Sequence, residues 1–372
     1  MILPRTESAA ATTAPRLVSL ATALPPHRAT QPDIKAAATR MFGPALSAID
    51  QRLLGVFDSA GIEQRHFVEP LEWYDQRRGF GEMNAAYLGH ALDLAAEALT
   101  KALERCGLTP KDLDHLVMVS STGVATPSLD ARLANRLGFR SDFRRTPVWG
   151  LGCAGGAAGL ARTRDFALAQ PDGIVALVAL ELCSLTFQRL DLDRRNLVAA
   201  SLFADGAACA IVAGAEASVP RPAFRPVELL GTRSMLWPET LDVMGWDVDD
   251  SGFHVVFSRD IPTIVREWVR PNLESFLAEH GLTLGGLQHV VAHPGGPKVL
   301  SAYAAALDLD PSAFRHAYEV LRECGNMSSP TCLFVLEKAL SAGDWAPGDR
   351  AVLAALGPGF SSELVLLRSA NA

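Results

Sequence analysis

The hydrophobic positions of this chain follow two periods in turn, and they predict helices that alternate with buried strands. Residues 92–107 carry apolar side chains at helical spacing and end at a glycine, which predicts an amphipathic helix. The continuous apolar runs at 113–121, 173–182 and 207–214 predict buried strands. Small and apolar residues at 153–170 predict a helix between the first two of these strands.

The second half of the chain repeats this order of elements. Helical spacing predicts helices at 263–281 and 330–343. Pro271 should kink or split the first of them, because proline removes a backbone donor and clashes with the preceding turn. Continuous apolar runs predict three more strands at 287–293, 351–357 and 362–368.

Two segments share six residues at identical spacing. GLTPKDLDHLV (107–117) and GLTLGGLQHVV (281–291) each follow a helix and open a strand. Either they are two similar helix-to-strand turns, or they mark a duplicated α/β half. The second interpretation divides the chain into halves at 16–220 and 221–372, after a flexible N-terminal arm at 1–15. A site between such halves would draw residues from both.

Composition and charge narrow the class of protein. The chain has 372 residues, of which 49% are hydrophobic, and a formal net charge of −7, which argues against nucleic-acid binding. No apolar run reaches the ~18 residues of a membrane span, and the N-terminus lacks the apolar region of a secretory signal. The six cysteines include no CxxC pair, which favours reduced thiols in a cytoplasmic protein over disulfides or a metal site.

Cys153 stands at the predicted corner between a strand and a helix. Unpaired backbone N–H groups at a helix N-terminus stabilise a thiolate, which predicts a pKa below the free value of ~8.5 and a nucleophilic sulfur. The small residues at 152–156 would leave room for an acyl group beside the sulfur. By contrast, Cys183, Cys209 and Cys332 lie in apolar runs, which is typical of inert buried thiols.

His293 is a candidate partner of this cysteine. It ends a predicted buried strand and precedes a Pro-Gly-Gly turn, and strand ends in α/β sheets are where ligands bind. A histidine there can pair with a cysteine as an ion pair and donate to a developing oxyanion, although it can also be a structural histidine. His289 lies four residues earlier, about 13 Å away along a strand, so a metal pair is not expected.

Asn326 is the second candidate partner, in the segment ECGNMSSPTCLFVLEKAL. An asparagine just before a helix is often an N-cap. Its amide can equally donate two hydrogen bonds to a thioester oxygen. The order Cys153, His293, Asn326, with each residue on a glycine-rich corner, predicts one shared site for acyl transfer.

Five motifs together resemble a type III polyketide synthase, the chalcone-synthase-like branch of the condensing enzymes: GLGCAGGAAGL, SLFADGAACAIV, AHPGGPKVL, ECGNMSSPTCLFVLEKAL and LGPGFSSELVLL. The resemblance implies an α/β fold, the thiolase-like duplicated αβαβα arrangement of five layers. It also implies a homodimer that needs no cofactor or metal and uses coenzyme A thioesters as substrates. Residues 244–247 are similar to bacterial alkylresorcinol and alkylpyrone synthases.

The resemblance also implies roles for further residues. Phe203 corresponds to an aromatic gatekeeper that contacts the malonyl group. A hydroxyl and carboxylate network near the cysteine and two positions in the pocket wall are implied as well. These are Ser121, Glu181 and Ser328 for the network, and Cys183 and Thr186 for the wall.

Two departures from the plant members concern the substrates. Val255 stands where those members have a phenylalanine, which would leave space for a longer starter. In the segment that binds coenzyme A, Arg52 matches one cation of the family, whereas Gly55 and Ser59 replace two others. Arg52 is therefore the one candidate for a contact with coenzyme A.

The function predicted from these features is iterative decarboxylative condensation of malonyl-CoA onto an acyl-CoA starter. The expected starter is a medium-chain or long-chain fatty acyl-CoA, and the expected products are alkylresorcinols or alkylpyrones. Two alternatives stay open from the sequence. One is an initiating-type ketoacyl-ACP synthase that performs a single condensation, and the other is a non-catalytic acyl-binding protein.

Overall fold

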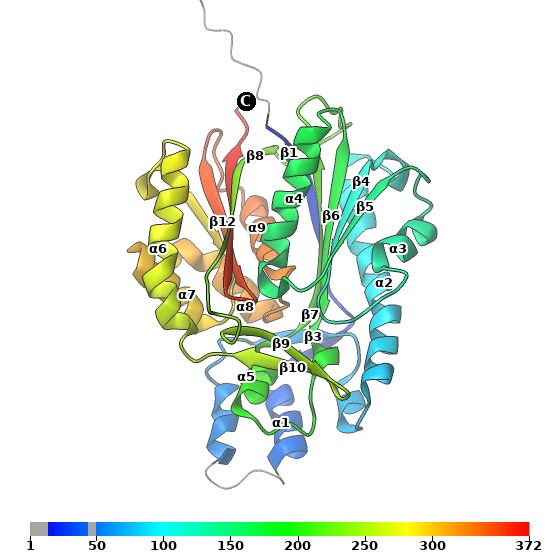
Figure 1. The fold of residues 1–372 in the computed structure, drawn as a ribbon, viewed down its shortest axis with the longest axis vertical. Helices are drawn as coiled ribbons and strands as arrows, with labels where there is room; N and C mark the ends of the chain where they lie inside the picture. Colours follow the sequence, from blue (N-terminus) through cyan, green and yellow to red (C-terminus); the bar gives the residue numbers. More distant parts are fainter. Residues whose placement is uncertain (1–13, 44–49, 372) are drawn as a thin grey trace, which may run out of the picture.

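A nine-stranded mixed sheet forms the centre of the molecule in the computed structural model, which describes residues 14–43 and 50–371 (Figure 1). Residues 1–13 of the predicted N-terminal arm lie outside the described residues. The strand order is β11-β12-β13-β8-β1-β7-β6-β4-β5. The strands are β1 (Arg16–Ala23), β4 (His115–Val119), β5 (Arg144–Val148), β6 (Ile174–Leu182), β7 (Asp205–Ala213), β8 (Val227–Leu236), β11 (His289–Ala292), β12 (Arg350–Gly357) and β13 (Ser361–Ser369).

The two ends of this sheet have the same strand pattern. β4 is parallel to β6, which is antiparallel to β7, which is antiparallel to β1. β11 is parallel to β12, which is antiparallel to β13, which is antiparallel to β8. β1 and β8 meet in the middle through a short antiparallel pairing. Two similar turns alone would not require this repeated strand order, so it favours a duplicated half, although the boundary near residue 220 stays a prediction.

The repeated sequence segments adopt the same local conformation. Gly107 and Gly281 both have left-handed backbone angles, with φ of 72° and 66°, and both follow the end of a helix. The next threonine in each segment is extended and leads into a short 3-10 turn and then into β4 or β11. The similarity of the two sequences therefore reflects one shared helix-to-strand connection.

The described residues form nine helices, and those that pack against the large sheet cover its outer faces or separate its two ends. α4 and α9 pack against strands from both ends and lie between them, with α2 and α3 on one outer side and α6 and α7 on the other (Figure 1). This arrangement is the layered αβαβα fold expected from the sequence. The helices are α1 (Gln31–Phe42), α2 (Phe80–Cys106), α3 (Leu129–Leu137), α4 (Gly155–Ala169), α5 (Arg194–Leu202), α6 (Ile261–Glu279), α7 (Pro297–Leu307), α8 (Arg315–Cys324) and α9 (Thr331–Ser341).

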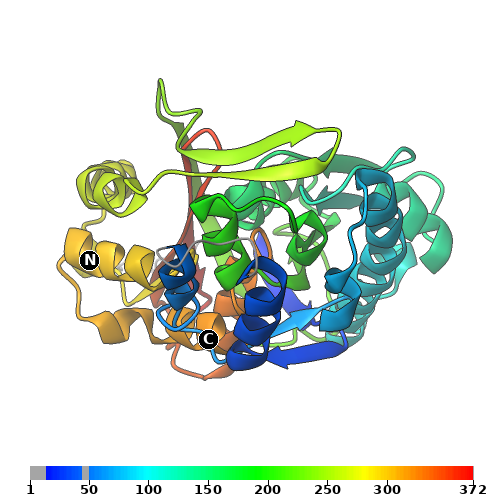
Figure 2. The same cartoon turned by 90° about the horizontal axis from the view of Figure 1, so that it is seen from below.

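The described structure also has two small antiparallel sheets of two strands each. β2 (His27–Thr30) pairs with β3 (Gln64–Phe67), and β9 (Met244–Asp249) pairs with β10 (Gly252–Phe257). The β9–β10 hairpin lies across one end of the molecule and contacts α5 (Figure 2). In the described residues, no helix is long and apolar enough to cross a membrane.

The predicted split at Pro271 is wrong, because α6 continues through this residue without a break. Tertiary contacts hold the turn that follows the proline. Arg233 donates a hydrogen bond of 3.0 Å to the carbonyl oxygen of Asn272, and the Asn272 side chain donates one of 3.1 Å to Ser362. These contacts hold Asn272, the residue directly after the proline, in place within α6.

The central helices α4 and α9 approach each other closely at Gly156. A Cβ atom at this position would lie 2.2 Å from the carbonyl oxygen of Ser329 and 2.7 Å from the sulfur of Cys332. Glycine is therefore required here to bring the start of α4 against the segment before α9. Both candidate site segments, around Cys153 and Asn326, depend on this contact.

We expect Gly156→Ala to lower the free energy of unfolding by about 1–3 kcal/mol, as overpacking of a rigid core does. The matched control is Gly89→Ala in α2, where a Cβ atom would meet nothing within 4 Å. That change should raise the stability by roughly 0.5–1 kcal/mol, because alanine is the better helix former. Chemical denaturation measures both, and equal effects of the two variants would contradict the proposed close contact.

Candidate active site

Cys153, His293 and Asn326 all line one cavity of about 420 Å³. Cys153 lies in the 3-10 turn Gly152–Ala154 before α4, His293 directly follows β11, and Asn326 lies between α8 and α9. The apolar part of the wall consists of Met244, Phe257, Ile261, Val299, Tyr303 and Leu356. The three residues that the sequence grouped are thus brought together, one from the first half of the chain and two from the second.

The corner that holds Cys153 packs against the turn between β12 and β13. A Cβ atom on Gly152 would lie 2.9 Å from Pro358, and one on Gly357 would lie 2.5 Å from the Cβ of Ala154. The small residues at 152–156 are therefore needed for close backbone packing. The expectation that they leave room for an acyl group is wrong, and that room lies in the cavity instead.

Asn326 is fixed by its backbone and by its side-chain oxygen. Its backbone forms a bridge beside Phe203, in which the Asn326 N–H donates to the Leu202 carbonyl over 2.9 Å. Its Oδ1 accepts a hydrogen bond of 2.8 Å from the Ser328 N–H, and its Nδ2 donates a longer one of 3.3 Å to the Gly295 carbonyl. Asn326 is therefore not the N-cap of α9, and its side chain also interacts with the Cys153 thiol by a hydrogen bond.

His293 is buried, and neither nitrogen of its ring has a hydrogen-bond partner among the described residues. A structural histidine would normally be satisfied by the protein, so the free nitrogens indicate a ligand. Burial lowers the pKa of His293 to about 3, which leaves the ring neutral at physiological pH. His289 differs, because its Nε2 lies 3.0 Å from an oxygen of Asp349 and its ring stacks on Trp345.

Burial opposes ionisation of the Cys153 thiol. Burial raises the pKa of Cys153 to about 11, a hydrogen bond from the Ser328 side chain lowers it, and the negative charge of Glu181 raises it further. Burial of the thiol therefore opposes the low pKa expected from the helix N-terminus, and the ion pair with His293 stays a prediction. Removing the thiol from water outweighs the helix N-terminus, because a buried thiolate loses its hydration.

Glu181 lies at the centre of a buried hydrogen-bond network behind the cysteine. Its carboxylate accepts hydrogen bonds of 2.8 Å from the Ser121 N–H, 2.8 Å from the Thr122 hydroxyl and 3.0 Å from the Ser329 hydroxyl. Burial raises the pKa of Glu181 to about 7. The network expected from the resemblance is thus partly corrected: Thr122 and Ser329 supply the hydroxyl donors. Each directly follows a residue that the sequence had singled out.

The hydroxyls of Ser121 and Ser328 have other contacts. Ser121 Oγ accepts hydrogen bonds from the backbone N–H of Gly150 at 3.1 Å and of Gly152 at 3.4 Å, so it supports the corner that carries Cys153. Ser328 adopts a left-handed conformation with φ of 58°, which holds its side chain near Cys153. Both residues therefore position the cysteine.

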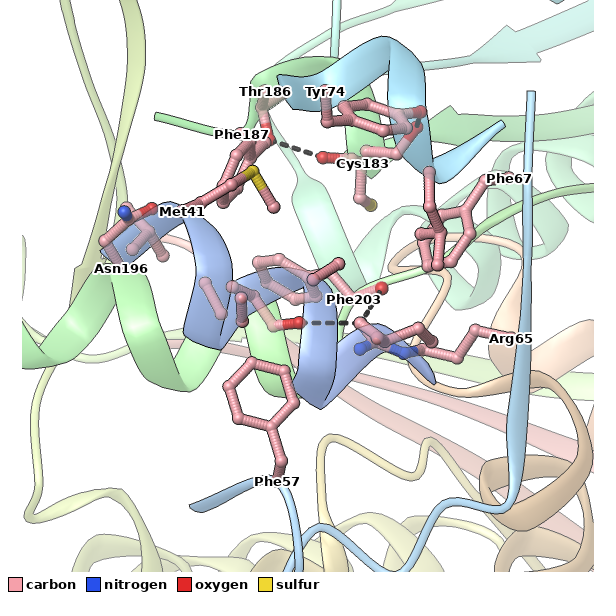
Figure 3. A pocket seen from close by; sticks show the side chains of 18 of the residues that line it. Met41, Phe57, Arg65, Phe67, Tyr74, Cys183, Thr186, Phe187, Asn196 and Phe203 are labelled. Atoms are coloured by element: carbon pink, nitrogen blue, oxygen red, sulfur yellow. Dashed lines mark hydrogen bonds between the residues drawn. The ribbon is translucent and has the colours of Figure 1, made fainter. Parts of the chain in front are cut away.

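A second, larger cavity of about 670 Å³ lies beyond Phe203 (Figure 3). Cys183, Thr186, Phe203 and Val255 line it, as the resemblance implied for a substrate pocket. Other lining residues were missed from the sequence: Ile34 and Met41 of α1, Arg65, Phe67, Tyr74 and Trp246. The sequence gives little indication that these residues share a pocket, because they come from separate elements. Each one, taken alone, is typical of an ordinary core or surface position.

Aromatic side chains separate the two cavities. The ring of Phe203 lies 5.7 Å from that of Phe257, which faces the cysteine cavity, and 6.1 Å from that of Trp246, which faces the larger cavity. Phe203 is also tied to Asn326 through the backbone bridge. A chain that extends from Cys153 into the larger cavity has to pass these rings.

Arg52 is exposed in the 3-10 segment Asp50–Val56 and does not line either cavity. Its role toward coenzyme A stays a prediction. Among the described residues, no group of three histidine, cysteine or acidic side chains could hold a metal ion.

The layered fold and a cavity shared by cysteine, histidine and asparagine are typical of a condensing acyltransferase. Comparison with known families agrees with this class. Residues 5–217 match the N-terminal domain of chalcone and stilbene synthases, and residues 228–371 match their C-terminal domain. The chain belongs to the chalcone and stilbene synthase family, whose members are type III polyketide synthases.

Individual relatives support the same family assignment. A 1,3,6,8-tetrahydroxynaphthalene synthase of Streptomyces peucetius subsp. caesius is 46% identical over 93% of this chain and 91% of that protein. A 3,5-dihydroxyphenylacetyl-CoA synthase of Streptomyces toyocaensis is 32% identical over 95% of this chain and 90% of that protein. The crystal structure of 1,3,6,8-tetrahydroxynaphthalene synthase from Streptomyces coelicolor A3(2) matches with a TM-score of 0.89 and 32% identity, over 96% of this chain and all of that one.

These findings confirm the thiolase-like fold, the enzyme class and the use of coenzyme A thioesters, for which the family needs no further cofactor. They also exclude the two alternatives left open by the sequence, a ketoacyl-ACP synthase and a non-catalytic acyl-binding protein. They do not single out the alkylresorcinol and alkylpyrone synthases.

The raised pKa of Cys153 predicts how the free enzyme reacts with iodoacetamide. Only the thiolate is alkylated, so the labelling rate of Cys153 should rise about tenfold per pH unit from pH 7 to 9 without a plateau. Glu181→Gln removes a charge that raises this pKa, so it should increase the rate at a given pH. Peptide mapping by mass spectrometry follows the label. A plateau below pH 7 would show a resting thiolate–imidazolium pair and contradict the neutral site.

Proposed function

We propose that Cys153 is the acyl carrier and that His293 and Asn326 bind the enolate oxygen of decarboxylated malonyl-CoA. The observation that supports this best is the shared cavity, in which neither nitrogen of His293 has a hydrogen-bond partner among the described residues and the Asn326 side chain interacts with the Cys153 thiol. Donors fixed in a dry site stabilise a developing oxyanion without having to reorganise.

The first step loads the starter. The sulfur of Cys153 attacks the carbonyl carbon of an acyl-CoA, and its proton passes to a free nitrogen of His293. The bond between the carbonyl carbon and the coenzyme A sulfur then breaks, and His293 returns the proton to the leaving thiolate. His293 is again neutral, as its lowered pKa favours.

The second step forms the new carbon–carbon bond. Malonyl-CoA loses carbon dioxide, and the electron pair of the broken bond becomes an enolate whose oxygen accepts hydrogen bonds from His293 and Asn326. The enolate carbon attacks the acyl carbonyl on Cys153, and the cysteine thiolate leaves. Transfer of the extended chain back to Cys153 starts another round.

The larger cavity supports a fatty acyl starter. Its wall is mostly apolar, and Val255 leaves the volume that a phenylalanine would fill. Each buried methylene stabilises the bound chain by about 0.8 kcal/mol, so a medium or long acyl chain is favoured over acetyl. The products would be alkylresorcinols or alkylpyrones.

A second candidate is a polyhydroxylated aromatic product built from malonyl-CoA alone. The relative of 46% identity is named for 1,3,6,8-tetrahydroxynaphthalene. A charged side chain, Arg65, in the cavity wall also favours a chain that carries oxygen atoms.

We also propose that the enzyme is a cytoplasmic homodimer. Trp149 and Val124 are large apolar side chains that are 55% and 49% exposed, and they lie near each other through the hydrogen bond from the Trp149 indole to the Gly123 carbonyl. A second chain would cover them. All six cysteines lie in the described residues and are free thiols, which suits a reducing compartment.

A panel of starters tests the substrate. With labelled malonyl-CoA, we expect kcat/KM to be higher for acyl-CoAs of about ten carbons or more than for acetyl-CoA, since each added methylene buries apolar surface. Val255→Phe should shift the preference toward shorter chains. The matched control is Val256→Phe, one residue along β10 and outside both cavities. Products formed from malonyl-CoA alone, with no gain from fatty starters, would favour the second candidate.

Asn326→Ala tests the oxyanion site. The variant should still be acylated by starter at Cys153, whereas its rate of carbon dioxide release from malonyl-CoA should fall about 10²–10³-fold, as after loss of one oxyanion donor. It also leaves the Ser328 N–H without its acceptor, so a modest fall in melting temperature is expected. Decarboxylation at the parent rate would remove Asn326 from the oxyanion site.

A further inference from the structure

Arg65 is a fully buried arginine in the wall of the larger cavity. It lies on β3, where the alternating pattern places Arg65 and Phe67 on the inner face, and only 1% of its surface is exposed. Figure 3 shows its side chain extending toward Phe203. Burial of a guanidinium is unusual unless all of its donors are satisfied.

Three of its five N–H groups have protein acceptors. Nε donates to Gln31 Oε1 over 3.2 Å, and Nη1 donates to the carbonyl oxygens of Ala200 at 2.8 Å and Phe203 at 2.6 Å. These bonds fix the plane of the guanidinium. They also connect Arg65 directly to the backbone of the residue that separates the two cavities.

The remaining nitrogen, Nη2, has no hydrogen-bond partner in the part of the chain that the structure describes. The Phe67 ring, whose centroid lies 5.4 Å from the guanidinium carbon, gives it partial compensation. Asp205 attracts the charge of Arg65, but the oxygens of this carboxylate accept hydrogen bonds from Val68 and Ser184. Two donors of a buried cation are thus left over.

The donors of the other polar side chains in this wall are used within the protein. Tyr74 donates to Ser184, and Ser184 donates to Asp205. Thr186 donates to the Cys183 carbonyl, and Asn196 donates to two backbone carbonyls. Among the described residues of this wall, Arg65 is therefore the one with a buried side-chain nitrogen or oxygen that has no hydrogen-bond partner.

We propose that Arg65 Nη2 is a binding subsite for an oxygen atom of the enzyme-bound chain, either a keto oxygen or a terminal carboxylate. A hydrocarbon tail alone would leave these donors unsatisfied, whereas an oxygen acceptor removes that penalty. This inference rests on the proposed use of the cavity by the growing chain. In this inference Arg65 affects how the oxygenated substrate chain is bent in the cavity and how long it grows. It takes no part in the chemistry at Cys153.

Arg65→Lys tests the subsite, because lysine keeps the charge and can still reach a backbone carbonyl but lacks the second terminal nitrogen. We expect acylation of Cys153 to stay within about twofold, because Arg65 lines the larger cavity and not the one that holds the Cys153 sulfur, so its hydrogen bonds are lost at a distance from the reacting atoms. The share of the longest product should fall at least fivefold in favour of shorter pyrones. The matched control is Arg164→Lys, because Arg164 also donates to two backbone carbonyls, Leu229 and Leu230, but lies away from the cavity.

The two sources of the oxygen atom give different results. If Arg65→Lys adds fewer malonyl units to a fatty acyl starter, the bound oxygen is a keto oxygen formed in an earlier round of condensation. If Arg65→Lys loses product only in the reaction with malonyl-CoA as the sole substrate, the bound oxygen belongs to the carboxylate of a malonyl starter. An unchanged product distribution in both reactions overturns the subsite.

A binding experiment on the unchanged enzyme is independent of folding defects and of turnover. Non-reactive coenzyme A thioethers with six-carbon, eight-carbon or ten-carbon chains are compared in pairs, one ending in methyl and one in carboxylate. By calorimetry, the carboxylate member should bind about tenfold more tightly at one length or more, as expected for a charge-assisted hydrogen bond. Weaker binding of the carboxylate at every length overturns the proposal. A preference for carboxylate in a protein that makes no polyketide would contradict the proposed function and leave the subsite intact.

Discussion

The position of the nucleophile depends on direct backbone packing between the two halves of the chain. Gly152 lies against Pro358, and Gly357 lies against Ala154, at distances where no Cβ atom fits. Gly156 brings α4 equally close to the segment before α9. Packing without intervening side chains is rigid, so the sulfur of Cys153 is held at a fixed distance from residues that lie more than a hundred positions away in the sequence.

The same packing excludes water, and this determines the charges of the site. Cys153 and His293 are both buried, so the pKa of the thiol is raised to about 11 and that of the imidazole is lowered to about 3. A neutral imidazole still carries one N–H that can donate a hydrogen bond to an enolate oxygen. In a site of low dielectric, such a donor acts more strongly than it would in water. Activation of the thiol therefore has to overcome the effect of this burial.

Much of the fold was predictable because its elements are long and strongly patterned. β6 and β7 are buried over their whole length, which produces the continuous apolar runs, and α2 ends at a left-handed glycine, Gly107. The error at Pro271 arose because a local rule ignores neighbours: contacts from Arg233 and Ser362 hold the next residue in place. In the site, Thr122 and Ser329 were missed because only the folded chain shows which of two adjacent hydroxyls faces Glu181.

The sequence by itself determined the α/β class, the family and the grouping of Cys153, His293 and Asn326, because short-range patterns and motif order carry that information. Only the tertiary structure decided the protonation of the site and the location of the larger cavity. Arg65 shows the reason. From the sequence alone, an arginine is expected at the surface. The pleat of β3 instead turns Arg65 inward beside Phe67, and one of its nitrogens has no partner among the described residues. Burial and hydrogen-bond satisfaction depend on distant segments, which no local pattern encodes.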